Sequence, residues 1–183
     1  YKPWDQRMCL VPDSDLFKAI KKNKASVVTD QISEFISDGI LLESGKKLSA
    51  DVIVTATGIE LNSLNDIDVT LDNVEINAHE RLTYKGMMLS GVPNFALSFG
   101  YVNASWTLRA DLTCEYVCRL IKLMDKKGVD CCVPLDDKTA YGDDDLIDFT
   151  SGYVQRGLHL MPKQGNKAPW KNYQNSVSYT HLT

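Results

Sequence analysis

The chain lacks the short motifs by which many enzymes are identified. Its eleven glycines include no G-x-G-x-x-G pattern, so no dinucleotide-binding fingerprint is present. Gly86 and Gly91 have the spacing of a P-loop, but Val92 stands where a phosphate-binding lysine is required, which excludes that motif. No G-x-S-x-G elbow occurs either, and none of the three histidines has an obvious nucleophile beside it. These absences argue against a self-contained nucleophilic hydrolase.

Long apolar runs and an excess of positive charge are also missing. No run approaches the ~20 residues of a membrane-spanning helix, and no signal peptide opens the chain. The 20 basic and 24 acidic side chains leave a formal charge of −4 with no basic stripe, which argues against nucleic-acid binding. Apolar residues make up 44% of the chain, as in ordinary globular proteins. We therefore expect a soluble, cytoplasmic protein with no stable membrane span and no nucleic-acid partner.

Cysteine is scarce and irregularly spaced. The five cysteines are an odd number, which does not fit the disulfide framework of a secreted protein. Cys114 and Cys118 share one face of a helix, but no histidine or further cysteine stands nearby to complete a metal shell. Cys131 and Cys132 are adjacent and would form a strained disulfide. We therefore expect reduced thiols and no bound metal.

The spacing of apolar residues predicts three helices. A short helix is expected over 14–22, and another over 151–161. The longest helix is expected from about Ser105 to Lys127, where the apolar residues form a wide stripe. Gly128 is a natural terminator for that helix.

The remaining apolar runs predict strands, which makes the fold class α/β. The run 51–58 (DVIVTATG) is continuously apolar and β-branched in its first half, as expected for a strand buried on both faces of a parallel sheet. The run 95–99 (FALSF) predicts a second apolar strand, and weaker strands are expected at 69–71 and 74–76. Turn residues separate three further runs and indicate a short antiparallel meander over 26–30, 32–36 and 39–43.

Two segments place small or polar residues at the end of a predicted element. Thr57 and Gly58 close the strand 51–58, where small residues allow the close approach of another backbone or of a cofactor, although a glycine at a strand end is more often a plain turn. The segment FGYVNASWT, 99–107, joins a strand to the long helix, whose first N–H groups favour an anionic group. Asn103 and Ser105 are also good helix caps, so capping alone is an equal alternative.

Four longer blocks of sequence are more specific than these short patterns. They cover most of residues 1–170 and read YKPWDQRMCLVPDSDLFKAI, SADVIVTATGIEL, YKGMMLSGVPNFALSFGYVNASWTLRADLTCEYVCRL and FTSGYVQRGLHLMPKQGNKAPW. With these blocks the chain resembles the C-terminal part of the class B flavoprotein monooxygenases, the flavin-containing and Baeyer–Villiger group, and particularly the bacterial ethionamide-activating type. Residues 59–83 and the acidic loop after residue 135 match this pattern poorly.

The resemblance implies a fold and a division of the chain. Such enzymes have two Rossmann-like domains, one for FAD and one for NADPH, and the FAD domain is built from both ends of the chain. Residues 1–57 would then end the NADPH-binding domain, 58–128 would be the C-terminal part of the FAD-binding domain, and 129–183 would be a C-terminal extension. The chain would be a fragment, which fits a first residue other than Met. The last residues, VSYTHLT, leave the family pattern and resemble translated cloning-adaptor sequence.

The resemblance also implies roles for particular residues. Arg7 matches the arginine that lies over the flavin in Baeyer–Villiger enzymes, where a permanently charged, planar guanidinium stabilises oxyanions; a surface or ion-paired arginine is the alternative. Gln6 stands where several relatives carry a lysine for the 2′-phosphate of NADPH. Trp106 would line the substrate pocket, although a core role is commoner for tryptophan. The other cofactor-binding residues would be Thr57, Gly58, Asn103, Ala104 and Ser105.

The expected function follows from this resemblance. It is an FAD-dependent, NADPH-consuming monooxygenase that inserts one oxygen atom of O₂ into ketones or adds it to the sulfur of thioethers and thioamides. A nearer alternative is a flavin monooxygenase that oxidises amines or sulfides without Arg7, and a more distant one is a non-catalytic, truncated interaction module. The chain alone is expected to be colourless, inactive and of low stability, because the sheet partners of 51–58 and 95–99 are missing from it.

Overall fold

The structure is a computed structural model that describes two separate parts of the chain. It covers residues 11–182 apart from 62, 63, 65, 66, 103, 136, 137, 141 and 143. Contacts divide the chain between Gly58 and Ile59 into an N-terminal unit, 11–58, and a C-terminal unit, 59–182, and each unit is described by itself. Across the described ranges, no helix combines the length and the apolar character needed to span a bilayer.

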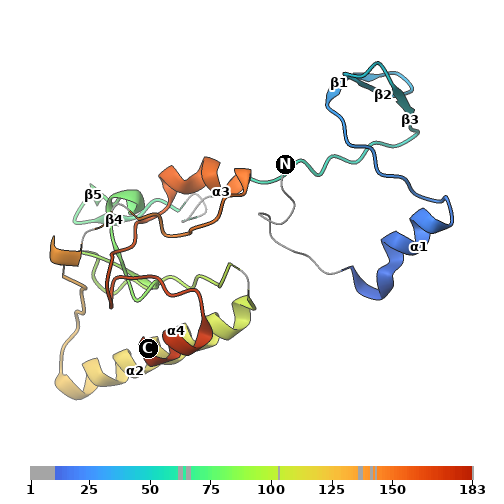
Figure 1. The fold of residues 1–183 in the computed structure, drawn as a ribbon. Coiled ribbons are helices and arrows are strands. Elements are labelled where there is room, and N and C mark those ends of the chain that lie inside the picture. The colour runs from blue at the N-terminus through green and yellow to red at the C-terminus, as the bar shows by residue number, and fades with distance from the viewer. Residues whose placement is uncertain are drawn as a thin grey trace. The chain divides into compact units, whose positions relative to one another are not determined.

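The N-terminal unit contains one α-helix and one small sheet (Figure 1). A 3-10 turn, η2 (Pro12–Ser14), leads into α1 (Asp15–Lys21), which confirms the short helix predicted there. The sheet is an antiparallel meander whose strands lie in the order β1 (Ile32–Ile36), β2 (Gly39–Leu42) and β3 (Lys47–Ser49).

The strand register of the meander depends on one glycine. Gly39 pairs with Ser49, and a Cβ on residue 39 would overlap the carbonyl oxygen of Leu48. Only glycine lets the two backbones approach this closely. The predicted meander is thus confirmed at β1 and β2, but its third strand is β3, and the predicted strand 26–30 is not formed.

The apolar run 51–58 does not form the predicted buried strand. Its backbone is not part of any strand of the described residues, and Val52 and Val54 are 78% and 83% exposed. A strand that is buried on both faces needs neighbouring strands to pair its backbone and helices to cover its side chains. None of the three sheets found among the described residues includes this run. The prediction is therefore wrong here, and the physical reason is the lack of a pairing partner in the described part of the chain.

The C-terminal unit is organised around α2 (Trp106–Lys127). This helix confirms the one predicted over 105–127, with Ser105 at its N-cap and Gly128 at its C-cap in the left-handed conformation, φ 63°. The predicted apolar stripe is buried only in part, because Leu108 and Ile121 are 45% and 52% exposed. The packed face of α2 contacts a buried cluster formed by Met87, Met88, Tyr101 and Tyr179.

Two short hairpins precede α2. β4 (Thr70–Leu71) pairs with β5 (Val74–Glu75), which confirms the weak strands predicted at 69–71 and 74–76. Asp72 and Asn73 between them both have positive φ, as a two-residue turn of type I′ requires. β6 (Thr83–Tyr84) pairs with β7 (Met88–Leu89) in the same antiparallel sense.

The run 95–99, which leads towards α2, is not the strand predicted from its sequence. Its side chains alternate between partly buried and exposed, as along one face of a sheet. Its backbone is nevertheless tied to the hairpin β6–β7 by one hydrogen bond, from the Leu97 N–H to the Met87 carbonyl at 2.6 Å. A single bond is not a strand ladder, so the prediction fails for lack of a partner, as for 51–58.

Residues after Gly128 pack into the same unit as α2. The helix predicted over 151–161 is confirmed as α3 (Gly152–Gly157) followed by η5 (Leu158–Leu160). α4 (Ser176–Leu182) lies alongside α2 (Figure 1), and its Tyr179 is fully buried. Within the terminal segment for which an adaptor origin is predicted, Tyr179 therefore lies in a buried cluster, whereas Val177 is 68% exposed. That origin stays a prediction.

Candidate cofactor-binding site at the start of α2

The segment 99–107 bends into α2 around a glycine. Gly100 is buried, and a Cβ at this position would overlap the indole ring of Trp106. The same indole packs against Phe99, with ring centroids 5.3 Å apart. Trp106 is nevertheless 50% exposed. The first residue of the helix therefore has a side chain that is fixed by packing yet still reaches solvent.

Ser105 occupies the N-cap of α2 but does not cap it with its side chain. The Ser105 hydroxyl lies 2.7 Å from the Thr107 hydroxyl, and it makes no hydrogen bond to the backbone N–H groups of the first turn. No acidic side chain stands in that turn. Capping by the Ser105 side chain, one part of the alternative left open by the sequence, is therefore not what the structure shows, and Asn103, the other candidate cap, lies outside the described residues.

An electron-rich ligand suits this helix start. A helix of 22 residues carries a partial positive charge of about +0.5 at its N-terminus. Its first N–H groups have no intrahelical acceptor and donate readily to anions and carbonyl oxygens. Ala104 and Ser105 are both exposed, so a ligand can reach this end of the helix. The residues present thus fit the oxygen- and nitrogen-bearing edge of a flavin ring.

Arg109 lies one turn after Trp106 in α2, and its side chain is fully buried. Its Nη2 donates to Asn172 Oδ1 at 2.5 Å, and its Nη1 donates to the Gly100 carbonyl at 3.5 Å. The guanidinium carbon lies 4.3 Å from the ring centroid of Tyr179 and 5.4 Å from that of Tyr101. Arg109 was not among the residues predicted from the sequence. The sequence does contain one signal for it, because a cation close to the N-terminus of a helix is placed unfavourably in the helix dipole and so suggests a special role.

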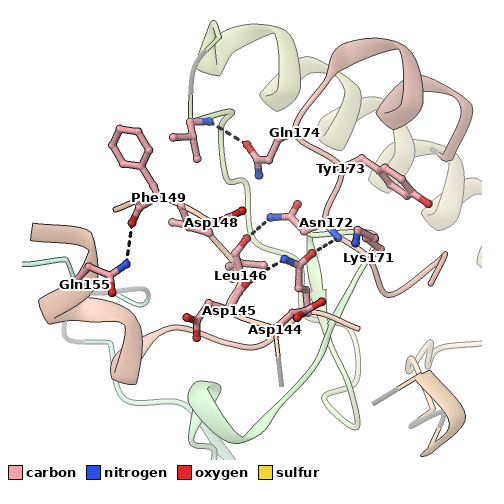
Figure 2. A pocket seen from close by; sticks show the side chains of 13 residues that line it. Asp144, Asp145, Leu146, Asp148, Phe149, Gln155, Lys171, Asn172, Tyr173 and Gln174 are labelled. Carbon is pink, nitrogen blue, oxygen red and sulfur yellow. Dashed lines mark hydrogen bonds between the residues drawn. The ribbon is translucent and has the colours of Figure 1, made fainter. Parts of the chain in front are cut away.

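Asn172 also lines a cavity of about 680 Å³ (Figure 2). Asp144, Asp145 and Asp148 give its lining negative charge, and Lys171 is the neighbouring cation. The cavity wall is tied to the segment before α2, because the Val102 N–H donates to Gln174 Oε1 at 3.0 Å. None of the predicted site residues that the structure describes lines this cavity.

Three consecutive residues of the predicted site lie at one place in the structure. Ala104, Ser105 and Trp106 all stand at the start of α2. Thr57 and Gly58 are exposed and end the N-terminal unit. The remaining predicted site residues, which lie outside the described part of the chain, are Gln6, Arg7 and Asn103.

The cysteines that the structure describes are free thiols. Cys114, Cys118 and Cys131 are exposed, and Cys132 is partly buried. Within the described residues, no group of three or more histidine, cysteine or acidic side chains is placed to hold a metal ion.

A lysine–tyrosine contact lies on another part of the packed face of α2. The Lys85 Nζ is 4.4 Å from the ring centroid of Tyr116 and 5.8 Å from that of Tyr84. Burial, with a smaller contribution from the nearby positive charge of Arg119, lowers the pKa of Lys85. Burial, reinforced by Tyr84, raises the pKa of Tyr116 to about 12. Both residues therefore favour their neutral forms more than they would in water.

The sequence is similar to curated flavoprotein monooxygenases along nearly all of its length. It is 48% identical over 179 residues to "Probable FAD-binding monooxygenase AlmA" of Acinetobacter baylyi. It is 49% and 47% identical over 175 residues to "FAD-containing monooxygenase EthA" of Mycobacterium tuberculosis and of Mycolicibacterium smegmatis. These matches cover 96–97% of this chain and 36% of each relative. No family model and no solved structure matches the chain.

Identity near one half over almost the whole chain shows common ancestry. The chain is homologous to part of proteins named FAD-binding or FAD-containing monooxygenases, in agreement with the family that its four sequence blocks resemble. It spans only about a third of the length of the curated relatives that it matches.

Proposed function

We propose that the chain is the C-terminal part of an FAD-dependent, NADPH-consuming monooxygenase. The whole protein would insert one oxygen atom of O₂ into ketones, or add it to the sulfur of thioethers and thioamides. Similarity to proteins named FAD-containing monooxygenases supports the reaction class. Within this chain, the proposal is supported mainly by the start of α2. Ser105 does not cap it with its side chain, and no acidic residue stands in its first turn, so its N–H groups are available to a ligand.

The proposed fold of the whole protein has two Rossmann-like domains. Residues 1–57 would end the NADPH-binding domain, 58–128 would belong to the FAD-binding domain, and 129–183 would be an extension. The exposed run 51–58 supports this division, because its continuously apolar sequence suits a strand that is covered on both faces. Such a strand would be completed by neighbours from the rest of the protein.

Several residues would hold or orient the cofactors. Bound FAD would supply the oxygen chemistry, using electrons from NADPH. Ala104 and Ser105, together with Asn103, would present the first N–H groups of α2 to the flavin, where the helix dipole favours negative charge. Trp106 would face the substrate with its half-exposed indole. The small residues Thr57 and Gly58 would allow a close approach of FAD, and Gln6 would face NADPH.

Arg7 would be the catalytic residue. Its guanidinium stays charged at any working pH and offers a planar fork of N–H donors. Placed beside the reacting oxygen, it would stabilise the negative charge that develops as the ketone carbonyl is attacked. Removing one such donor from an active site costs roughly 3 kcal/mol of transition-state stabilisation.

Arg7→Ala in the full-length protein tests this role. We expect ketone oxygenation to fall by at least about 100-fold, while FAD remains bound and NADPH is still consumed. Lys122→Ala, an exposed cation of α2, is the control and should leave all three measurements unchanged. Ketone oxygenation at the wild-type rate in Arg7→Ala would favour the amine- or sulfide-oxidising alternative. A full-length protein that purifies without FAD and does not consume NADPH would refute the proposed function as a whole.

The colour of the isolated chain provides a second test. Purified residues 1–183 should be colourless and should not oxidise NADPH, because the proposal places part of each cofactor domain outside this sequence. A yellow chain that binds FAD and consumes NADPH by itself would contradict the proposed division into domains.

A further inference from the structure

Arg109 is the only charged side chain that is buried among the described residues. No carboxylate pairs with it there, and its Nε has no hydrogen-bond partner. Its contacts are two neutral oxygens and the rings of Tyr101 and Tyr179. Burying a cation against neutral groups costs free energy, so a protein that only needed a stable core would be better served by an apolar residue. The placement therefore calls for another explanation.

The two donated hydrogen bonds join segments that are distant in the sequence. Nη1 holds the carbonyl of Gly100, the residue on which the Trp106 indole packs. Nη2 holds Oδ1 of Asn172, 63 positions away. Arg109 thus connects the bend before α2 directly to the C-terminal segment.

Asn172 is itself held by a chain of hydrogen bonds (Figure 2). Its Nδ2 donates to the Leu146 carbonyl at 2.9 Å, and its backbone N–H donates to Gln164 Oε1 at 2.9 Å. Gln164 Nε2 in turn donates to the Asp145 carbonyl at 2.6 Å. The side-chain amide of Asn172 therefore joins Leu146 to Arg109, and that of Gln164 joins Asp145 to the backbone of Asn172. The chain of bonds runs from the cavity wall to the start of α2.

The contact between Arg109 and Asn172 is closely packed against a glycine. Gly86 has positive φ, 62°, and a Cβ there would overlap both Arg109 Nη2 and Asn172 Oδ1. The pair therefore lies directly against the hairpin turn between β6 and β7. A lysine at position 109 would keep the charge but could not reach Gly100 and Asn172 with a rigid fork of donors.

We infer that Arg109 is a positioning residue for the flavin cofactor. By holding Gly100 from one side and Asn172 from the other, it fixes the direction in which the start of α2 presents its N–H groups. The C-terminal segment 164–172 thereby becomes part of the cofactor site without touching the cofactor. This inference rests on the proposed function, because it assigns the start of α2 to FAD.

Arg109→Lys and Asn172→Ala in the full-length protein test the inference, with Lys122→Ala as the exposed control on the same helix. The dissociation constant for FAD is measured on folded apoprotein, together with the visible spectrum and midpoint potential of the bound flavin. We expect each of the two variants to weaken FAD binding about tenfold or more, equivalent to about 1.4 kcal/mol, and to shift the flavin spectrum. The double variant should lose little beyond either single variant, because both changes break the same connection.

The possible results distinguish a role of Arg109 in orienting the FAD site from a role in stabilising the fold alone. FAD binding within about twofold of wild type and an unchanged spectrum would overturn the inference, even if the melting temperature fell. If Arg109→Lys does not fold, Asn172→Ala decides the question, because it leaves the arginine in place. If wild-type protein binds no FAD, the proposed function fails first and the inference falls with it. Normal FAD binding in wild type with normal binding in both variants refutes the inference alone.

Discussion

The two units of the chain bury their apolar residues to very different extents. In the C-terminal unit, four clusters of buried side chains pack together, and Leu89 and Tyr101 are each only 1% exposed. In the N-terminal unit, Phe17 and Phe35 are 63% and 59% exposed. Leu42 is the one apolar side chain of the described residues 11–58 that is buried.

The difference shows that strands can pair through their backbones without burying their apolar side chains in a core. The meander β1–β3 satisfies its own backbone hydrogen bonds through local turns, so it needs no distant partner to form. Apolar burial needs a second surface, and a small sheet without one is only marginally stable. The free energy of folding of this chain should therefore come mainly from residues 59–182.

The largest expected effect comes from truncating one apolar side chain in each unit and comparing the losses of stability. Leu89→Ala should lower the free energy of unfolding by about 2–5 kcal/mol, because it leaves a cavity in a packed cluster. Phe35→Ala should change it by less than about 0.5 kcal/mol, because the ring is already mostly in water. Urea denaturation followed by circular dichroism measures both. Equal losses would show that the N-terminal unit has a core of its own.

A smaller effect is expected at the buried end of α4. Tyr179→Phe removes the hydroxyl that lies 3.0 Å from the Thr113 hydroxyl and leaves that buried group without this bond. The expected loss is about 1–3 kcal/mol of unfolding free energy. Tyr173→Phe, which removes the hydroxyl of a partly buried ring, is the matched control. No difference between the two variants would mean that α4 does not contribute to the core in solution, as an adaptor-derived tail would not.

In the N-terminal unit, Gly39→Ala should break the meander without touching the C-terminal unit. The new Cβ would overlap the Leu48 carbonyl oxygen, so β2 and β3 would have to separate. We expect the change to cost more than about 1 kcal/mol locally. Amide hydrogen exchange should then speed up in β1–β3 and remain unchanged in α2. Faster exchange in α2 as well would show that the two units fold together.

The smallest effect concerns alkaline pH. The pKa of Tyr116 is raised to about 12 by burial, so the folded state holds the phenol proton more tightly than the unfolded state. This contribution to stability is complete below pH ~10 and is lost as the pH rises towards 12. Tyr116→Phe should therefore show a shallower loss of stability over that range, measured by urea denaturation at successive pH values. An identical slope in wild type and variant would contradict this assignment.

Features with local causes could be predicted from the sequence. α2 begins one residue after the predicted start and ends at the predicted Lys127, because its apolar stripe, Ser105 and Gly128 all act within a few turns. The hairpin strands β4 and β5 were predictable for the same reason, since Asp72 and Asn73 favour the turn that joins them.

Features that depend on distant partners could not be predicted in this way. The runs 51–58 and 95–99 have strand composition, but a strand exists only where another strand pairs with it. The contact between Arg109 and Asn172 joins positions 63 residues apart, and no local pattern specifies it. The family resemblance predicted which segment forms the candidate site, whereas the buried network behind that segment became visible only in the fold.

The packing of the Trp106 indole on Gly100 makes the intrinsic fluorescence of Trp106 a probe of the start of α2. Of the two tryptophans in the described part of the chain, Trp170 is 4% exposed and Trp106 is 50% exposed. A water-soluble quencher should therefore reduce the emission of Trp106 far more than that of Trp170. Because Trp106 is the first residue of α2, protection of its emission from the quencher would report in real time when a ligand occupies the start of that helix.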